Sequence, residues 1–232
     1  MAGKSVGSEL MGKKSAPAKD DSDKIRPLRK HGNLIVITGP SGVGKGTVVQ
    51  RLLDTVPKLT RSVSVTTRTR RPSEISGVDY FFHTQAEFDQ MVADGMFMEF
   101  AEFAGNNYGT PSSWVMQEVK AGRDVILEIE VQGAKQIKEK FPSAVLIFLS
   151  PPSFEALRSR LKGRATEEPI KMALRLRKAR LEMRERWLFH YEVINDKVDE
   201  AVKNLINIVY AERCRIRDNE ANSPKNEYNK NS

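Results

Sequence analysis

The sequence predicts an α/β fold, in which a parallel β-sheet carries helices on both faces and an α+β segment is inserted into it. Short apolar runs at 33–38 (NLIVIT), 124–130 (DVILEIE) and 144–150 (AVLIFLS) are typical of strands buried on both faces, and a segment with helical spacing follows each of them. This alternation favours a parallel sheet, because parallel strands need long crossover connections. With 232 residues and 39% hydrophobic content, the chain suffices for one domain with insertions or for two small domains.

Helices are expected in the crossovers. From Lys45 to Leu53 apolar residues recur at helical spacing, and Pro57 ends the element soon after. Further helices are expected at 132–140 and 154–161, followed by a long basic helix at 170–189 and an amphipathic helix at 198–217. A short strand at 191–195 (YEVIN) separates these last two helices.

Residues 61–114 follow a different pattern. SVSVTT (62–67) alternates like a half-exposed strand, and YFF (80–82) and MFMEFAEF (96–103) are further strand candidates. A helix is expected between the last two of these strands. Thr84 and Glu87 form a capping box at its start, and Gly95 is its natural stop. We expect an α+β subdomain that projects from the core sheet.

The composition favours a reduced intracellular protein. Cys214 is the single cysteine of the sequence, and no run of about 18 apolar residues predicts a membrane span. Residues 1–31 and 218–232 are polar without periodicity and are expected to be disordered tails. The first tail has eight Lys and Arg against four Asp and Glu, so it holds +4 of the net charge of +8, and nucleic-acid binding is not expected. Its acidic DDSD argues against a transit peptide, so we expect the cytoplasm, with a plastid or mitochondrion as the alternative.

The turn after the first strand indicates a phosphate-binding loop. Its glycines let backbone N–H groups point at an anion, and Lys45 adds the charge that a terminal phosphate needs. Gly46 stands where such loops carry a serine or threonine that binds the metal ion. Thr47 is the nearest replacement, so Mg²⁺ is expected to depend more on water and neighbouring carboxylates. The expected loop residues are Gly39, Pro40, Ser41, Gly42, Val43, Gly44, Lys45, Gly46 and Thr47.

Glu128 and Glu130 stand two positions apart at the C-terminal end of the second buried strand, and therefore on one face. Ligands of open α/β sheets bind at that end. Two carboxylates there repel each other unless a cation or arginines lie between them. We expect both to line the substrate site and Glu128 to bind the metal, mostly through water; simple solvated alternation on an edge strand is the alternative.

Taken together, these motifs resemble the guanylate kinase family. TGPSGVGKGT, SVSVTTRTRRPSEISGVDYFF, FMEFAEFAGNNYGTP, LEIEVQG, PPSFEALRSRLKGRATE and VIND occur in the family's order from about residue 33 to 215. The resemblance implies a P-loop fold of the nucleoside monophosphate kinase type and the reaction ATP + GMP to ADP + GDP with Mg²⁺, with dGMP as a further acceptor. It implies a domain at 32–217 with a core (32–60, 115–158 and 181–217), a GMP-binding insert (61–114) and a mobile lid (159–180).

The acceptor site needs planar cations for a phosphate and an acceptor for guanine. Arg68 and Arg71 supply the cations, beside the hydroxyl groups of Tyr80 and Tyr108. Guanine presents an N1–H and an amine as donors, so a carboxylate gives selectivity. The resemblance assigns this role to Glu99, joined by Ser64 and Thr110.

Phosphoryl transfer asks a protein mainly for positioning and charge stabilisation. The resemblance places Arg160 and Arg164 in the lid, Arg175 at the start of the next helix, and Asn195 beside the adenine pocket, although turn chemistry alone also favours an asparagine there. The residues expected to act in catalysis are Lys45, Arg68, Arg71, Arg164 and Arg175. By contrast, we expect Arg177, Lys178 and Arg180 on the basic helix to face water.

Two features depart from the family pattern LDIDxQG and its glycine-rich lid. Glutamates replace aspartates at 128 and 130, which moves each carboxylate outward by roughly 1.3 Å. Ala165 and Pro169 predict a stiffer lid. The alternatives are a kinase for AMP, UMP or CMP, a catalytically silent module that binds a phosphorylated peptide, and a switch GTPase. The acceptor motifs argue against the first alternative, and the presence of Lys45 with the lid arginines argues against the second. The sequence has no N-K-x-D element, which a switch GTPase would need to bind its base. Monomer and homodimer both stay open.

Overall fold

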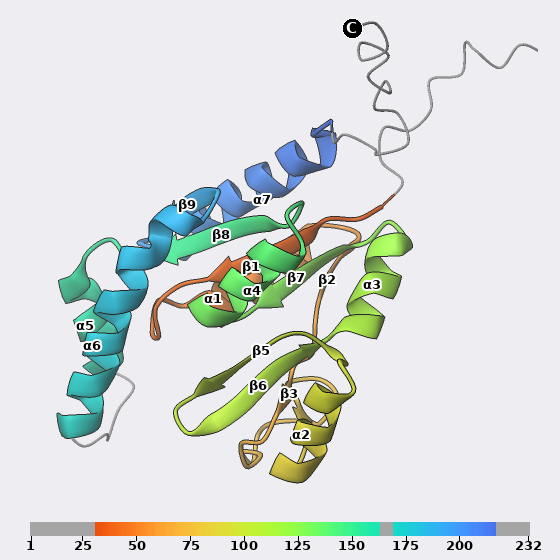
Figure 1. The fold of residues 1–232 in the computed structure, drawn as a ribbon. Coiled ribbons are helices and arrows are strands. Elements are labelled where there is room, and N and C mark those ends of the chain that lie inside the picture. The colour runs from red at the N-terminus through yellow and green to blue at the C-terminus, as the bar shows by residue number, and fades with distance from the viewer. Residues whose placement is uncertain (1–30, 163–168, 217–232) are drawn as a thin grey trace, which may run out of the picture.

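The computed structural model describes residues 31–162 and 169–216 (Figure 1). The predicted tails at 1–31 and 218–232, apart from His31, and the middle of the predicted lid lie outside the described residues.

Within the described residues, five parallel strands form the core sheet in the order β2-β7-β1-β8-β9. These strands are β1 (Leu34–Thr38), β2 (Leu59–Arg61), β7 (Asp124–Glu128), β8 (Val145–Ser150) and β9 (Tyr191–Ile194). β1 lies in the middle, where Ile35 pairs with Ile126 of β7 on one side and with Val145 of β8 on the other. The predicted parallel sheet is confirmed.

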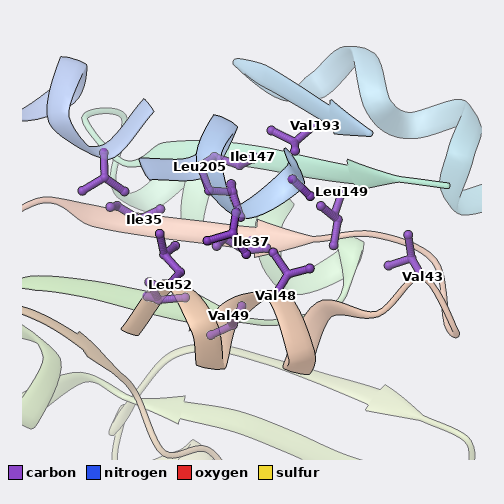
Figure 2. Close-up of a cluster of buried hydrophobic side chains, with 14 of the residues drawn as sticks. Ile35, Ile37, Val43, Val48, Val49, Leu52, Ile147, Leu149, Val193 and Leu205 are labelled. Carbon is purple, nitrogen blue, oxygen red and sulfur yellow. The ribbon is translucent and has the colours of Figure 1, made fainter. Parts of the chain in front are cut away.

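Apolar packing on both faces of the core sheet explains the continuous apolar runs. On one face, Ile35 and Ile37 of β1 pack with α1 (Lys45–Thr55) and α7 (Val198–Cys214) (Figure 2). On the other face, Leu34 and Val36 pack with α3 (Ser112–Lys120) and α4 (Val131–Lys140). Because successive side chains of a strand point to opposite faces, a strand covered on both sides has no polar positions in its sequence.

A second sheet of four described strands, in the order β4-β3-β6-β5, forms the insert. Its elements are β3 (Val65–Thr66), β4 (Phe81–Phe82), α2 (Gln85–Ala93), β5 (Phe97–Phe103) and β6 (Asn106–Pro111). β3 pairs parallel with β4 and antiparallel with β6, so the sheet is mixed. The capping box of Thr84 and Glu87 starts α2 as predicted, and Phe88 of this helix packs on Phe97.

The hairpin between β5 and β6 turns at Ala104 and Gly105, which both have positive φ angles, of 52° and 74°. Paired positive φ angles match the right-handed twist of the flanking strands. The turn therefore allows β5 and β6 to form a twisted hairpin.

Several predicted elements differ in extent from the observed ones. The basic helix of 170–189 is α6 (Pro169–Arg184) followed by a 3₁₀ turn at Glu185–Leu188, and α7 ends at Cys214 rather than 217. α5 spans Phe154–Lys162, close to the prediction. Only 65–66 of the predicted strand 62–67 pair. No helix among the described residues is both long enough and apolar enough to cross a bilayer.

The strand predicted at 124–130 ends at Glu128. The expectation that Glu128 and Glu130 both belong to this strand is therefore wrong. Glu130 is instead the N-cap residue of α4, with extended φ and ψ of −80° and 164°. The chain has to leave the sheet here to begin the crossover helix, so pairing stops before the apolar pattern does.

Candidate active site

The loop at 39–47 joins the C-terminal end of β1 to α1, and its backbone leaves no room for side chains at two glycines. A Cβ on Gly39 would lie 2.2 Å from the carbonyl oxygen of Leu149. Gly44 has a φ of 97°, and a Cβ there would lie 2.8 Å from Nδ2 of Asn195. No side chain caps α1, and its first turn has no acidic residue, so its N–H groups and positive helix end are available to an anion.

Lys45 lies across this loop. Its Nζ donates to the carbonyl oxygen of Gly39 at 2.6 Å and lies 3.9 Å from Oε1 of Glu130, with 13% of the side chain exposed. A Cβ on Gly46 would meet only Oε1 of Glu128, at 3.8 Å, so space does not require glycine there. Thr47, the predicted replacement for the missing hydroxyl, is exposed in the first turn of α1.

The other predicted donor-site residues that the structure describes make hydrogen bonds to the loop or to one another. Asn195 is 3% exposed, and its Nδ2 donates to the carbonyl oxygen of Val43 at 2.8 Å. Arg160 donates to the carbonyl oxygen of Asn195 at 2.9 Å, and Arg175 donates to Oγ of Ser41 at 3.0 Å. These residues therefore converge on the phosphate loop. The predicted lid residue Arg164 lies outside the described residues.

A cavity of about 230 Å³ lies between the two sheets, in front of the carboxyl end of β7. Of the predicted acceptor-site residues, all but Thr110 line it: Ser64, Arg68, Arg71, Tyr80, Glu99, Tyr108, Glu128 and Glu130. The topology thus brings residues from both sheets to one cavity, with the arginine–tyrosine group and the carboxylates at its walls.

Arg68 is held by Glu74, a residue that the sequence analysis missed. Nη2 of Arg68 lies 2.7 Å from Oε1 of Glu74, and the other oxygen of Glu74 accepts the backbone N–H of Arg71 at 2.8 Å. This hydrogen bond raises the pKa of Arg68 and lowers the pKa of Glu74. The guanidinium carbon lies 5.4 Å from the ring centre of Tyr80, and the rings of Tyr80 and Tyr108 meet edge to face at 5.9 Å. A single acid within TRTRRPSE was the available signal for Glu74.

Glu99 also lines the cavity and is buried, with 4% of its surface exposed. Oγ1 of Thr110 donates to its Oε1 at 2.6 Å, so Thr110 orients Glu99 without lining the cavity. Burial raises the pKa of Glu99 to about 7, because a carboxylate loses hydration there. A Cβ on Gly133 would lie 2.1 Å from Oε2 of Glu99, so this glycine of α4 makes room for the carboxyl group.

Cations lie near both Glu128 and Glu130, as expected for two neighbouring carboxylates that would otherwise repel each other. Nη1 of Arg61 lies 3.9 Å from Oε2 of Glu128, and burial raises the pKa of Glu128 against the opposing effects of Lys45 and Arg61. Glu130 lies between Lys45 at 3.9 Å and Lys178 at 3.8 Å. Lys178 is 43% exposed, so the expectation that it faces water holds in part, but its ammonium group also pairs with Glu130. Arg177 is exposed as expected, and Arg180 is exposed with its guanidinium 4.7 Å from the ring centre of Phe154.

The oxygen donors around the loop fit a Mg²⁺ ion that binds together with a nucleotide. No group of three or more His, Cys, Asp or Glu among the described residues could hold a metal alone. Mg²⁺ is usually held by one or two carboxylates, waters and substrate phosphates. Glu128 places a carboxylate beside the phosphate loop, 3.8 Å from where a Cβ on Gly46 would be, and Thr47 adds a hydroxyl group in the first turn of α1.

Comparison with known proteins assigns the family. The family model described as guanylate kinase matches residues 31–212. The guanylate kinase of Lactococcus lactis is 48% identical over 189 residues, which cover 82% of this chain and 92% of that protein. That of Streptococcus agalactiae is 47% identical over 190 residues, covering 82% and 91%. The crystal structure of guanylate kinase from Anaplasma phagocytophilum aligns with a TM-score of 0.69 and 33% identity over 81% of this chain and 89% of that one. The chain therefore belongs to the guanylate kinase family.

Proposed function

We propose that the phosphate loop and the cavity between the sheets are the donor and acceptor sites of the guanylate kinase reaction, ATP + GMP to ADP + GDP. The observation that carries this assignment is their contact: Glu130 lines the cavity and lies 3.9 Å from Nζ of the loop residue Lys45. An acceptor phosphate bound in the cavity would thus lie next to the loop, as direct transfer between two nucleotides requires.

The acceptor nucleotide is assigned to the insert. Arg68 and Arg71 bind its phosphate, with Tyr80 and Tyr108 as additional hydrogen-bond donors, and Glu74 keeps the arginine loop ordered. Glu99 accepts the N1–H and amine of guanine. Adenine presents an acceptor at N1, so it would leave this buried carboxylate without its partner, which is a strong basis for discrimination. Ser64 lines the same cavity.

The donor nucleotide is assigned to the loop at 39–47. Backbone N–H groups and Lys45 bind the phosphates of ATP, and Arg160, Arg164 and Arg175 offset the charge that spreads over the transferred group. Asn195 borders the adenine side. Thr47 and Glu128 hold Mg²⁺, mostly through water, and the ion neutralises charge on the donor phosphates.

We further propose the division into core (32–60, 115–158, 181–217), GMP-binding insert (61–114) and lid (159–180). Two described boundaries support it, because β2 ends at Arg61 and α3 begins at Ser112. A cytoplasmic location fits the bacterial relatives and the exposed Cys214, which a reducing compartment keeps as a thiol.

A coupled ADP-release assay tests the function. Purified protein is given MgATP with GMP, dGMP, AMP, UMP or CMP in turn, and we expect turnover with GMP, weaker turnover with dGMP, and only background with the rest. Equal turnover of AMP, UMP or CMP would contradict the role of Glu99. A protein that binds GMP without releasing ADP would instead be a silent binding module.

A further inference from the structure

One lysine of helix α6 contacts three separate parts of the molecule. Nζ of Lys178 lies 3.8 Å from Oε2 of Glu130 in the core, 3.7 Å from Oε1 of Glu182 on α6 itself, and 3.7 Å from the ring centre of Phe103 in the insert. Figure 1 shows the end of the β5–β6 hairpin, which carries Phe103, pointing toward α6. The Lys178 side chain is 43% exposed. Its three partners belong to three different elements, the N-cap of α4, α6 and β5.

These contacts are chemically complementary. An ammonium group within about 6 Å of a ring centroid is attracted by the electron-rich ring face. Glu182 is 6% exposed, and one oxygen each of Glu130 and Glu182 has no hydrogen-bond partner within the described residues. Two carboxylates that have lost hydration repel each other, and Lys178 is the cation placed between them.

Lys178 is linked to the transfer site through Glu130. One oxygen of this carboxylate lies near Lys178 and the other lies 3.9 Å from Lys45 of the phosphate loop. Phe103 lines the acceptor cavity together with Glu130. One turn earlier on α6, Arg175 contacts Ser41 of the same loop. Helix α6 therefore docks on the donor loop through Arg175 and on the acceptor side through Lys178.

We propose that Lys178 is a positioning residue for phosphoryl transfer: it fastens the end of the acceptor hairpin at Phe103 to Glu130 and α6, and so sets the distance between the acceptor phosphate and the phosphate loop. The proposal rests on the function assigned above and deepens it. Because Lys178 acts through Phe103 and Glu130 rather than through a nucleotide, its loss should affect the transfer step more than the binding of either substrate. A misplacement of about 1 Å can reduce the rate by about a hundredfold.

The main test is steady-state kinetics of Lys178→Met, which keeps an unbranched apolar side chain and removes the charge. We expect kcat to fall by about tenfold, while KM for ATP and KM for GMP each change by less than about threefold. Lys178→Arg should recover most of kcat, because a guanidinium can make both the ion pairs and the ring contact. Arg177→Met is the matched control, since Arg177 is exposed on the neighbouring position of the same helix, and its kcat should equal that of the wild type.

A double-mutant cycle separates positioning from a general loss of stability. Phe103→Leu should lower kcat, and the double variant Lys178→Met with Phe103→Leu should be no slower than the more impaired single variant, because both changes break one contact. Unfolding temperatures of all variants are measured in parallel. Wild-type kcat in Lys178→Met, additive losses in the double variant, or a rise in KM for GMP without a fall in kcat would each overturn the proposal. Failure of the wild-type protein to turn over GMP would instead refute the assigned function.

Discussion

The buried carboxyl group of Glu99 makes a quantitative prediction about stability and pH. Glu99→Gln replaces an ionisable group with a neutral one of nearly the same shape, whose amide oxygen can still accept from Thr110. The unfolded chain ionises Glu99 near its ordinary pKa of 4.5, whereas burial raises the pKa in the folded protein to about 7. Between these values the folded state keeps a proton that the unfolded state has released, so stability falls as the pH rises through this window and levels off above it.

Each pH unit between the two pKa values corresponds to about 1.36 kcal/mol. The wild-type protein should therefore lose about 2.5 kcal/mol more than Glu99→Gln when the pH rises from 5 to 8, measured as the free energy of unfolding in urea without nucleotide. Burial raises the pKa of Glu182 to about 7 as well, but Glu182 is present in both proteins, so the difference between them isolates Glu99. Parallel curves for the two proteins across this range would refute the reasoning.

The same variant tests the acceptor role. A glutamine offers guanine one acceptor and one donor in place of two acceptors, so we expect kcat/KM for GMP to fall by about a hundredfold, equivalent to about 2.7 kcal/mol. KM for ATP should change by less than about threefold. Glu102→Gln, an exposed position on the same strand, is the control and should behave like the wild type. Equal losses of kcat/KM for ATP and for GMP would show that Glu99 supports the fold rather than the recognition of guanine.

Three further changes test the site. Lys45→Met should abolish ADP release with an unchanged circular dichroism spectrum, because the loop loses its charge for the phosphates; turnover at the wild-type rate would exclude the donor assignment. Gly133→Ala should raise KM for GMP by about tenfold and lower the unfolding temperature, because the added methyl group would overlap Oε2 of Glu99. An unchanged KM and unfolding temperature would mean that the Glu99 side chain can move aside. Glu74→Gln should raise KM for GMP severalfold at constant KM for ATP, since Arg68 loses its ion pair, and an equal change in both KM values would contradict this.

The core of the fold was predictable because its strands are buried on both faces. Leu34 to Ile37 alternate between two apolar clusters, so the segment is apolar throughout and stands out in the sequence. β2 and β6 were not predicted: β2 has three residues, and β6 contains Asn, Gly and Pro, which strands usually avoid. α3 has nine residues, so its helical spacing covers only about two and a half turns.

The site residues that could be predicted lie within local motifs. Of the missed residues, Glu74 also lies within such a motif, whereas the contacts of Lys178 join distant segments. Arg68 and Arg71 lie in the arginine-rich motif TTRTRR, whereas Lys178 and Phe103 are brought together only when α6 docks against the hairpin. On a basic helix, solvent exposure is the ordinary expectation for a lysine. Here the side chain stays 43% exposed, and only the packing of three elements gives its ammonium group the contacts with Glu130, Glu182 and Phe103.

The irregular position of the phosphate loop has a structural counterpart on β7. Gly46 removes the hydroxyl that normally accompanies the metal in such loops. The carboxylate of Glu128 lies beside that position, because its Oε1 is 3.8 Å from where a Cβ on Gly46 would be. Arg61 and Lys45 lower the energy of the charged form of Glu128, against the effect of burial. A carboxylate oxygen therefore lies next to the place where the loop lacks a hydroxyl oxygen. This arrangement supports the proposal that Glu128 on β7, together with Thr47, supplies oxygen ligands for Mg²⁺ at a loop that lacks the usual hydroxyl.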